Sequence, residues 1–305
     1  MPTIKFARLS IFAAACFMPA ACTVNLNPFG GGGDPGPAQP AEVPEGIDPN
    51  SFWIERRTNA LDFTGVTTMR IDIPTGRVIL TIEDGAAPTL KLTKTVLKPN
   101  QSKDQCADIL NRSILTAERS FVDAARLEIG ADLGRGIEKT DIAFDVQLTL
   151  PTSVPTQIIL ENGPVEAKGL AANLEIRTDN GAINLTNVIG NVVAETSKRP
   201  IEIVNVAGNI RAETSDADVV LRIAPPNGGS VFVETTNGGI DLALAPATNA
   251  SLNLDAEGGS VAADLTAFRV SNLTTAADVL RCVLNDGGGQ IEARTTGGDI
   301  QLVGL

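Results

Sequence analysis

The second half of this 305-residue chain repeats a short phrase every 18 residues. Ala172, Gly190 and Gly208 are each followed by Asn and then by alternating apolar and polar residues, as in Asn173-Leu-Glu-Ile-Arg-Thr. A unit this short cannot bury its own apolar side, so it is stable only when it stacks on its neighbours. The repeat therefore predicts an all-β fold, a single-chain parallel β-solenoid whose coils each contain two short strands and two turns.

We place the solenoid repeats at residues 155–305, which would give about seven or eight coils and a stack about 40 Å long at the usual strand spacing. Asn-Gly pairs at 162–163, 180–181 and 237–238 favour the positive φ of a tight corner. In one coil, the residues expected to point inward are Leu174, Ile176, Ile183, Leu185 and Val188. Glu175, Arg177, Asn184 and Thr186 are expected to point outward.

The repeat breaks at about residues 262–289. This irregular segment contains Cys282 and the turn sequence Asn285-Asp-Gly-Gly-Gly, after which the repeat resumes. An exposed end of a solenoid would recruit other strands, so the ends need to be covered. The segment is therefore either an insertion or a cap over the open end.

Residues 51–154 read as an N-terminal β-rich segment with one short helix. Strand-like alternation is clear at 140–150, where Phe144 falls on the inward side. Ser102 and Gln105 have the spacing of a capping box, which marks the start of the helix. Cys106, Ile109 and Leu110 then share one helical face.

The N-terminus reads as a lipoprotein signal peptide, residues 1–21, which we exclude from the fold. Its apolar stretch is too short to span a bilayer, and Pro19-Ala-Ala-Cys22 resembles a lipobox with Pro in place of the usual Leu. We expect Cys22 to be lipidated and to bind the membrane. Cys16 is a rival lipidation position, and an ordinary secretory signal is the other alternative. Thr23 after Cys22 favours the outer membrane by analogy.

Residues 22–50 form a Pro/Gly-rich tether that cannot bury enough apolar area to fold. The formal net charge of −12 argues against a nucleic-acid partner. The chain has no His, which removes the commonest general base at neutral pH and a common zinc ligand.

Two cysteines remain in the folded part, Cys106 and Cys282, and both lie where the sequence departs from the repeat. In an oxidising envelope compartment such a pair predicts a disulfide. Two separate buried thiols are the alternative.

Asp216 and Asp218 are the best candidates for catalytic acid and base, because they are two residues apart on one face. Glu195 and Glu213 are expected near them on stacked coils. A corner where Asp replaces Asn-Gly explains the same residues without catalysis, so we predict no enzyme and no cofactor. The acidic residues near Gly- and Asn-rich turns do not have the spacing of a calcium loop, and no metal site is predicted. These residues are Asp179, Asp216, Asp218, Asp286 and Asp299.

Two further features suggest contacts on the outer surface. Phe232 is expected to point outward but is too isolated to make a sugar-stacking platform. Thr residues recur in one row along the coils and suit either an extended protein contact or simply a pleated strand. They are Thr178, Thr196, Thr214 and Thr235.

The coil phrases Glu234-Thr-Thr-Asn-Gly-Gly-Ile-Asp-Leu and Arg294-Thr-Thr-Gly-Gly-Asp-Ile-Gln-Leu resemble the DUF4097 putative adhesin family, as does the run-in Asp145-Val-Gln-Leu-Thr-Leu-Pro. The resemblance covers roughly residues 60–305 and departs at the Cys282 segment. It implies a parallel β-solenoid at the cell envelope and brings no catalytic residues.

From all of this we expect a lipid-anchored envelope protein with a structural or adhesin-like role and a protein or polymer partner. The alternatives are a carbohydrate-active β-helix enzyme and a regulatory partner of an envelope-stress system.

Overall fold

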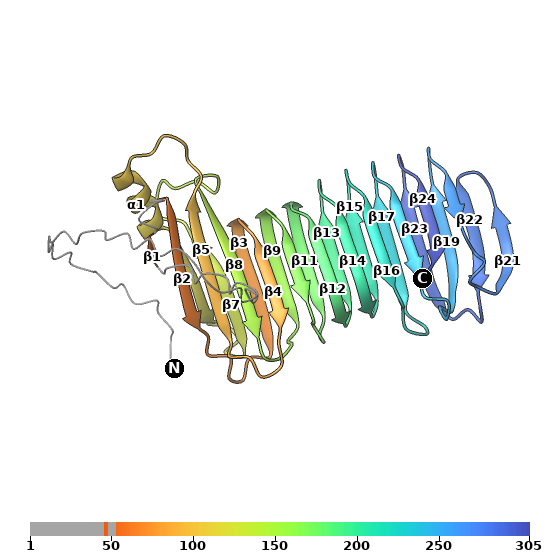
Figure 1. Cartoon of the computed structure of the whole chain (residues 1–305), viewed down its shortest axis with the longest axis horizontal. Helices are drawn as coiled ribbons and strands as arrows, with labels where there is room; N and C mark the ends of the chain where they lie inside the picture. Colours follow the sequence, from red (N-terminus) through yellow and green to blue (C-terminus); the bar gives the residue numbers. More distant parts are fainter. Residues whose placement is uncertain (1–45, 48–52) are drawn as a thin grey trace, which may run out of the picture.

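The computed structural model describes residues 46–47 and 53–305. These residues form two twelve-stranded β-sheets that enclose one apolar core and make a single elongated stack (Figure 1). The predicted all-β solenoid is confirmed. The signal peptide, Cys16, Cys22 and the tether, apart from Gly46–Ile47, lie outside the described residues.

We name the two sheets A and B. In spatial order, sheet A contains β1 (Gly46–Ile47), β2 (Ile54–Ala60), β5 (Thr89–Val96), β8 (Ile142–Leu150), β4 (Val78–Ile82), β10 (Val165–Lys168), β12 (Ile183–Ile189), β14 (Ile201–Ala207), β16 (Val219–Ile223), β18 (Ile240–Leu244), β24 (Ile300–Gly304) and β20 (Val261–Ala263). Sheet B contains β21 (Val270–Thr275), β22 (Val279–Leu284), β19 (Ala250–Ala256), β23 (Gly289–Thr295), β17 (Ser230–Thr235), β15 (Ile210–Thr214), β13 (Val192–Thr196), β11 (Leu174–Asn180), β9 (Thr156–Asn162), β3 (Thr68–Thr75), β7 (Arg126–Asp132) and β6 (Ile114–Arg119).

Through the middle of the stack, successive strands alternate between the two sheets. β11 pairs in parallel with β13, with Leu174 opposite Val192 and Ile176 opposite Ala194, so residues 18 apart are neighbours. β12 pairs with β14 in the same way. The 18-residue repeat is therefore the length of one complete turn of the solenoid.

The inward positions predicted from the alternation are confirmed. Leu174, Ile176, Ile183, Leu185 and Val188 are all buried, and they belong to a core cluster that runs through the whole stack. Phe144 is also fully buried, as predicted. Of the residues predicted to point outward, Arg177 and Asn184 are exposed and Glu175 and Thr186 are half-buried.

The Asn that opens each repeat forms a hydrogen-bonded ladder along one corner. Asn173 Oδ1 accepts the backbone N–H of Asn191 at 3.0 Å, and Asn191 Oδ1 accepts the backbone N–H of Asn209 at 3.2 Å. Asn209 Oδ1 accepts the backbone N–H of Ser230 at 2.8 Å, across the longer 21-residue coil. The ladder satisfies corner amides that the sheets leave unpaired, so Asn has a structural reason to recur here.

The Asn-Gly corners need glycine for two different reasons. Gly163 has a positive φ of 130°, as the sequence predicted, whereas Gly181 and Gly238 do not have a positive φ. A Cβ atom on Gly181 would lie 1.7 Å from the carbonyl oxygen of Gly163, and one on Gly238 would lie 1.9 Å from that of Ala217. At these two corners the constraint is close stacking of backbone on backbone, which corrects the prediction.

At the N-terminal end, the order of the coils differs from their order in the sequence. β3 pairs with both β7 and β9, and β4 pairs with both β8 and β10, so the β3–β4 coil lies between two later ones. β5 and β6 then add antiparallel strands to β8 and β7. The segment predicted to precede the solenoid therefore contributes strands to the same two sheets, and the solenoid begins before residue 155.

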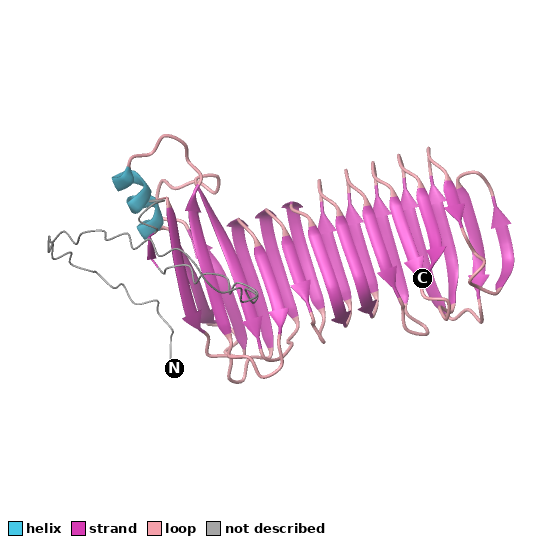
Figure 2. Ribbon diagram, viewed as in Figure 1, coloured by secondary structure: helices cyan, strands magenta, loops and turns pink. Residues whose placement is uncertain are grey.

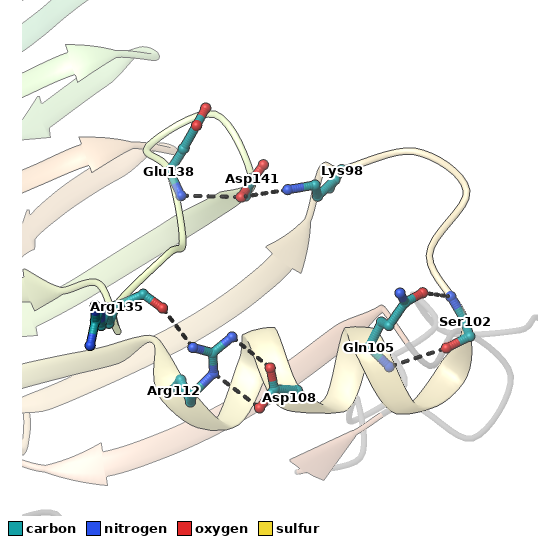
Figure 3. Close-up of polar contacts among 8 residues, drawn as sticks. All are labelled: Lys98, Ser102, Gln105, Asp108, Arg112, Arg135, Glu138 and Asp141. Atoms are coloured by element: carbon teal, nitrogen blue, oxygen red, sulfur yellow. Dashed lines mark hydrogen bonds and ion pairs between the residues drawn. The ribbon is translucent and has the colours of Figure 1, made fainter.

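The helix α1 (Lys103–Arg112), at this same end, is the one helix among the described residues (Figure 2). Its predicted capping box is confirmed: Ser102 N–H donates to Gln105 Oε1 at 2.8 Å, and Gln105 N–H donates to Ser102 Oγ at 3.3 Å (Figure 3). Cys106, Ile109 and Leu110 are buried, as their shared face predicted. The helix contacts β5 and closes one end of the core.

The C-terminal end contains a second exchange of order. The last coil of the chain, β23–β24, is inserted between the β17–β18 coil and the β19–β20 coil. Beyond β19, the strands β22 and β21 extend sheet B with antiparallel pairing. The break in the repeat at about residues 262–289 is thus a cap at the end of the stack, one of the two alternatives that the sequence left open.

The predicted disulfide between Cys106 and Cys282 is not present. Cys106 lies in α1 at the N-terminal end, Cys282 lies in β22 at the C-terminal end, and both are free and buried. The whole length of the solenoid separates them, whereas a disulfide needs Cα atoms within about 7 Å. The two cysteines are separate buried thiols.

Candidate functional site

The most distinctive feature of the outer surface is a row of three glutamates on sheet B. Glu195, Glu213 and Glu234 occupy matching positions on β13, β15 and β17, each directly opposite the next. Neighbouring strands of a sheet lie about 4.8 Å apart, so three carboxylates follow one another along the stack. We call these three residues the acidic row.

Arginines flank the acidic row at both ends. Arg177, opposite Glu195 on β11, lies 3.2 Å from Glu195 and 3.1 Å from Glu175. Arg294 follows Glu234 in register on β23 and forms an ion pair with Glu292 of its own strand. Within the row, Glu213 pairs with Arg211 at 2.5 Å. Among the described residues Glu234 has no ion pair, which leaves the row a local excess of negative charge.

The acidic row forms one side of a shallow groove of about 410 Å³ that is open to solvent. Ser197, Ser215 and Thr236 contribute hydroxyls from the adjoining turns, and among the described residues no aromatic ring lines the groove. The lining residues are Arg177, Thr178, Asp179, Glu195, Thr196, Ser197, Glu213, Thr214, Ser215, Glu234 and Thr236. The groove offers carboxylates and hydroxyls to a polar or basic partner, and it does not enclose a small molecule.

Asp216 and Asp218 do not join Glu195 and Glu213 in this groove. Asp216 Oδ1 accepts a hydrogen bond from Asn237 Nδ2 at 2.7 Å, and Asp218 Oδ1 accepts the backbone N–H of Gly239 at 2.8 Å. Both aspartates therefore bind the next coil at a corner. This is the corner role that the sequence offered as the alternative to catalysis.

The Thr row faces the core and not the solvent. Thr178, Thr196, Thr214 and Thr235 are all buried. Thr196 Oγ1 donates to the carbonyl oxygen of Gly181 at 3.0 Å, and Thr235 Oγ1 donates to that of Ala217 at 2.9 Å. Thr196, Thr214 and Thr235 therefore hold the tight corners. Since all four threonines are buried, the idea that they form an exposed surface for a protein partner is wrong.

Phe232 lies on the outer face of sheet B, as predicted, but its ring is half-buried and covered. The guanidinium of Arg211 lies 5.3 Å from the ring centroid, a cation–π distance. Because a charged side chain already occupies its face, the ring is a poor platform for a sugar.

Metal ligands do not gather anywhere among residues 53–305. In this part of the chain, no group of three or more Cys, Asp and Glu residues is arranged to hold a metal ion. Two of the turn aspartates have other partners, since Asp286 pairs with Arg269 at 2.9 Å and Asp299 accepts the N–H of Ser260 at 2.8 Å. Turn chemistry explains these residues.

A buried charge cluster near α1 was missed in the sequence. Lys94 and Glu55 are both buried and form an ion pair, and Lys94 Nζ also donates to the carbonyl oxygens of Leu110 at 2.6 Å and Ser113 at 3.1 Å. Burial lowers the pKa of Lys94, and Glu55 partly offsets the effect. The missed signal was the alternation of β5, which puts Lys94 on the same inward side as Leu92. The cluster fastens the C-terminal end of α1 to sheet A, and it is structural.

Comparison with known proteins gives a family model described as Toastrack DUF4097, which matches residues 137–303. None of the curated proteins compared with the chain matches it. Within the described part of the chain, no helix has the length and apolar character needed to cross a membrane.

Similar solved structures include proteins from Clostridium, Bacteroides and Parabacteroides. A putative cell adhesion protein from Clostridium sporogenes is 12% identical, with 83% of this chain and 100% of that chain covered and a TM-score of 0.34. A putative adhesin from Bacteroides fragilis is 11% identical, with 82% and 97% covered and a TM-score of 0.34. A putative lipid binding protein from Parabacteroides distasonis is 12% identical, with 81% and 96% covered and a TM-score of 0.31. These similarities are too low to assign a function.

Proposed function

The chain belongs to the Toastrack DUF4097 family, and from this premise we propose that it is a lipid-anchored, non-enzymatic scaffold of the bacterial cell envelope. The observation that carries the proposal is the shape of the stack: twelve strands per sheet, spaced about 4.8 Å apart, make a rigid body about 50 Å long. The described chain enters at one end, beside β2, and the cap of β21 and β22 lies at the other (Figure 1). A stack attached by its N-terminal end holds its cap away from the point of attachment.

The attachment is the acylated Cys22, followed by the Pro/Gly-rich tether of residues 22–50. By its composition, the segment between Cys22 and β1 is expected to act as a spacer. The anchor and the tether together would let the stack stand off the membrane surface, and the outer membrane is the proposed location.

The outer face of sheet B is the surface we propose for a protein or polymer partner. Its strands carry outward polar and charged side chains at a regular spacing, and the acidic row is its most strongly charged part. An extended partner with matching cationic groups fits such a face, because charge complementarity sets the orientation and the association rate.

Metabolic labelling with an alkyne fatty acid, followed by membrane fractionation, tests the anchor. Wild type and the Cys16→Ser variant should carry label and sediment with the membrane, whereas Cys22→Ser should lose both. If only Cys16→Ser loses the label, Cys16 and not Cys22 is the lipidated residue. Label that survives both substitutions contradicts the lipoprotein proposal and leaves a released solenoid.

The groove beside Glu195 and Glu213 is the observation that favours a carbohydrate-active enzyme instead. Incubation of the chain with a panel of envelope polysaccharides, followed by mass spectrometry of released sugars, tests this second function. If the wild-type chain releases sugars and Glu195→Gln or Glu213→Gln abolishes this release, the chain is an enzyme and the scaffold proposal is wrong. The matched control is Glu202→Gln, on the outer face of sheet A.

A further inference from the structure

The strand β21 is the last strand of sheet B at the capped end. It pairs with β22 on one side, and no hydrogen bond joins its other edge to any described strand. Five of its six residues are exposed, among them Leu273, and the exposed run continues to Asp278. A free strand edge presents a row of backbone N–H and C=O groups that can pair with another strand.

The other long edge of sheet B is better protected. β6 carries Glu118 and Arg119, and the Arg119 guanidinium donates to the carbonyl oxygens of Asp62 at 3.2 Å and Thr64 at 2.6 Å. By contrast, residues 270–277 contain no charged side chain and no Pro, although the chain has a formal net charge of −12. The devices that natural proteins use to block an edge are therefore present at β6 and largely missing at β21.

The charges that flank β21 are complementary to a reversed copy of themselves. Arg269 precedes the strand and is well exposed even though it contacts Asp286, and Asp278 follows the strand and is exposed. When two copies of β21 run antiparallel, the Arg269 end of one lies beside the Asp278 end of the other, twice per pair. Uncharged residues then face each other between the two ends.

We propose that two copies of this chain associate through their capped ends, with β21 of one copy pairing antiparallel with β21 of the other. In the proposed register, the two copies of Thr274 lie opposite each other at the two-fold axis, with Leu273 next to them. Because the bulge between Ser271 and Thr274 adds one residue, this register places Arg269 opposite the second copy's Asp278. The two sheets B become one continuous sheet across a two-fold axis, and two stacks join end to end.

An irregularity in β21 limits this pairing. The register shifts between Ser271 and Thr274, where Asn272 has a positive φ of 53°. Such a bulge shortens the regular edge. A two-fold contact also uses the same edge on both copies, so it closes after one partner and does not continue into a fibre.

The inference does not depend on the anchor proposed above, so it is tested on the chain from residue 22 onward with Cys22→Ser, which keeps every described residue. Molar mass from light scattering over a concentration series should change from one chain to two. X-ray scattering of the dimer should give a maximum dimension close to twice that of the monomer.

Three variants test the register. Asp278→Arg sets Arg against Arg at both ends and should weaken the dimer at least about tenfold, which is about 1.4 kcal/mol. The double variant Arg269→Asp with Asp278→Arg should restore most of the affinity. Leu273→Lys puts two like charges at the centre of the contact and should also give a monomer.

Glu257→Arg is the matched control, because it makes the same charge change on an exposed turn outside β21. It should leave the dimer unchanged, and circular dichroism should show that all variants are folded. A monomer at every concentration overturns the proposal. So does a dimer that Asp278→Arg and Leu273→Lys both leave intact, or an assembly that grows beyond two chains.

Discussion

Asn173 and Asn191, one complete coil apart, are joined by a hydrogen bond from the backbone N–H of Asn191 to the side-chain Oδ1 of Asn173, at 3.0 Å. The same bond recurs between Asn191 and Asn209. This contact explains the most regular residue of the repeat, because the side chain of each Asn supplies the acceptor that the next corner lacks.

Asn191→Ala removes one acceptor from this ladder and leaves the N–H of Asn209 unpaired. We expect the free energy of unfolding to fall by about 0.5–1.5 kcal/mol, the usual net contribution of one hydrogen bond, because water reaches this corner. Urea unfolding measures this change in the free energy of unfolding. The control is Asn184→Ala, on the exposed face of sheet A, whose stability should lie within about 0.5 kcal/mol of wild type. Equal effects of the two substitutions would contradict a specific role for the ladder.

Gly181→Ala should be far more damaging. Its Cβ would lie 1.7 Å from the carbonyl oxygen of Gly163 and 2.7 Å from Thr178 Oγ1, so two coils would have to separate at the corner. We expect a loss of about 3 kcal/mol or more, or failure to fold. Gly130→Ala is the control, because its Cβ would meet nothing closer than 3.9 Å. Thermal unfolding of both variants gives the comparison, and a Gly181→Ala protein as stable as Gly130→Ala would disprove the close stacking.

Lys94→Met tests the buried cluster that holds α1. The substitution removes one of the two cations that pair with the buried Glu55 carboxylate, leaving Arg57, and it leaves the carbonyl groups of Leu110 and Ser113 without a donor. Because Arg57 still pairs with Glu55, we expect a loss of about 1–3 kcal/mol, the usual cost of leaving buried carbonyl groups without a donor. Arg222→Ala breaks a half-exposed pair with Glu202 and should cost less than about 1 kcal/mol. Denaturant unfolding distinguishes the two, and a small effect of Lys94→Met would show that the cluster does not stabilise the fold.

Asp141 should make the N-terminal end sensitive to acid. Its carboxylate accepts the backbone N–H of Glu138 at 3.1 Å and contacts Lys98 at 3.2 Å (Figure 3). The backbone hydrogen bond, followed by Lys98, lowers the pKa of Asp141 below its ordinary value. The folded state therefore favours the charged form. This stabilisation is complete above the unfolded pKa of about 3.9 and is lost as the pH falls through the lower folded pKa.

Asp141→Asn should accordingly be less stable than wild type at neutral pH, by about 1.5–3 kcal/mol for hydrogen bonds to a charged group. The difference should shrink as the pH falls below about 4. Unfolding measured from pH 7 to pH 3 gives the two curves. A difference that stays constant over this range would show that the carboxylate charge has no part in it.

The two cysteines should behave as separate thiols. Burial raises the pKa of both Cys106 and Cys282, so both should react slowly with an alkylating reagent in the folded protein. Once the protein is unfolded without reductant, mass spectrometry should show both alkylated. If the two cysteines became alkylated only after reduction, a Cys106–Cys282 disulfide would be present. The two ends of the stack could then not lie where the structure places them.

The sequence by itself determined the local geometry of this protein. The 18-residue spacing equals one solenoid turn. The alternation of apolar and polar residues predicted that Leu174 and Ile176 point inward and that Glu175 and Arg177 point outward. The capping-box spacing of Ser102 and Gln105 predicted the start of α1. Each of these properties depends on residues close together in the chain or one coil apart, so pattern and turn chemistry were enough to predict them.

Only the tertiary structure decided which coils are neighbours at the ends of the stack. The apolar faces of β3–β4 and β23–β24 fit any parallel neighbour equally well, so the alternation could not reveal that both coils are inserted out of sequence order. The prediction of a Cys106–Cys282 disulfide failed for the same physical reason. Both cysteines lie in segments that break the repeat, and no local pattern shows how far apart two such segments lie in space. The 18-residue spacing already put Glu195 and Glu213 on stacked coils, and the register across the longer 21-residue coil added Glu234 to the acidic row.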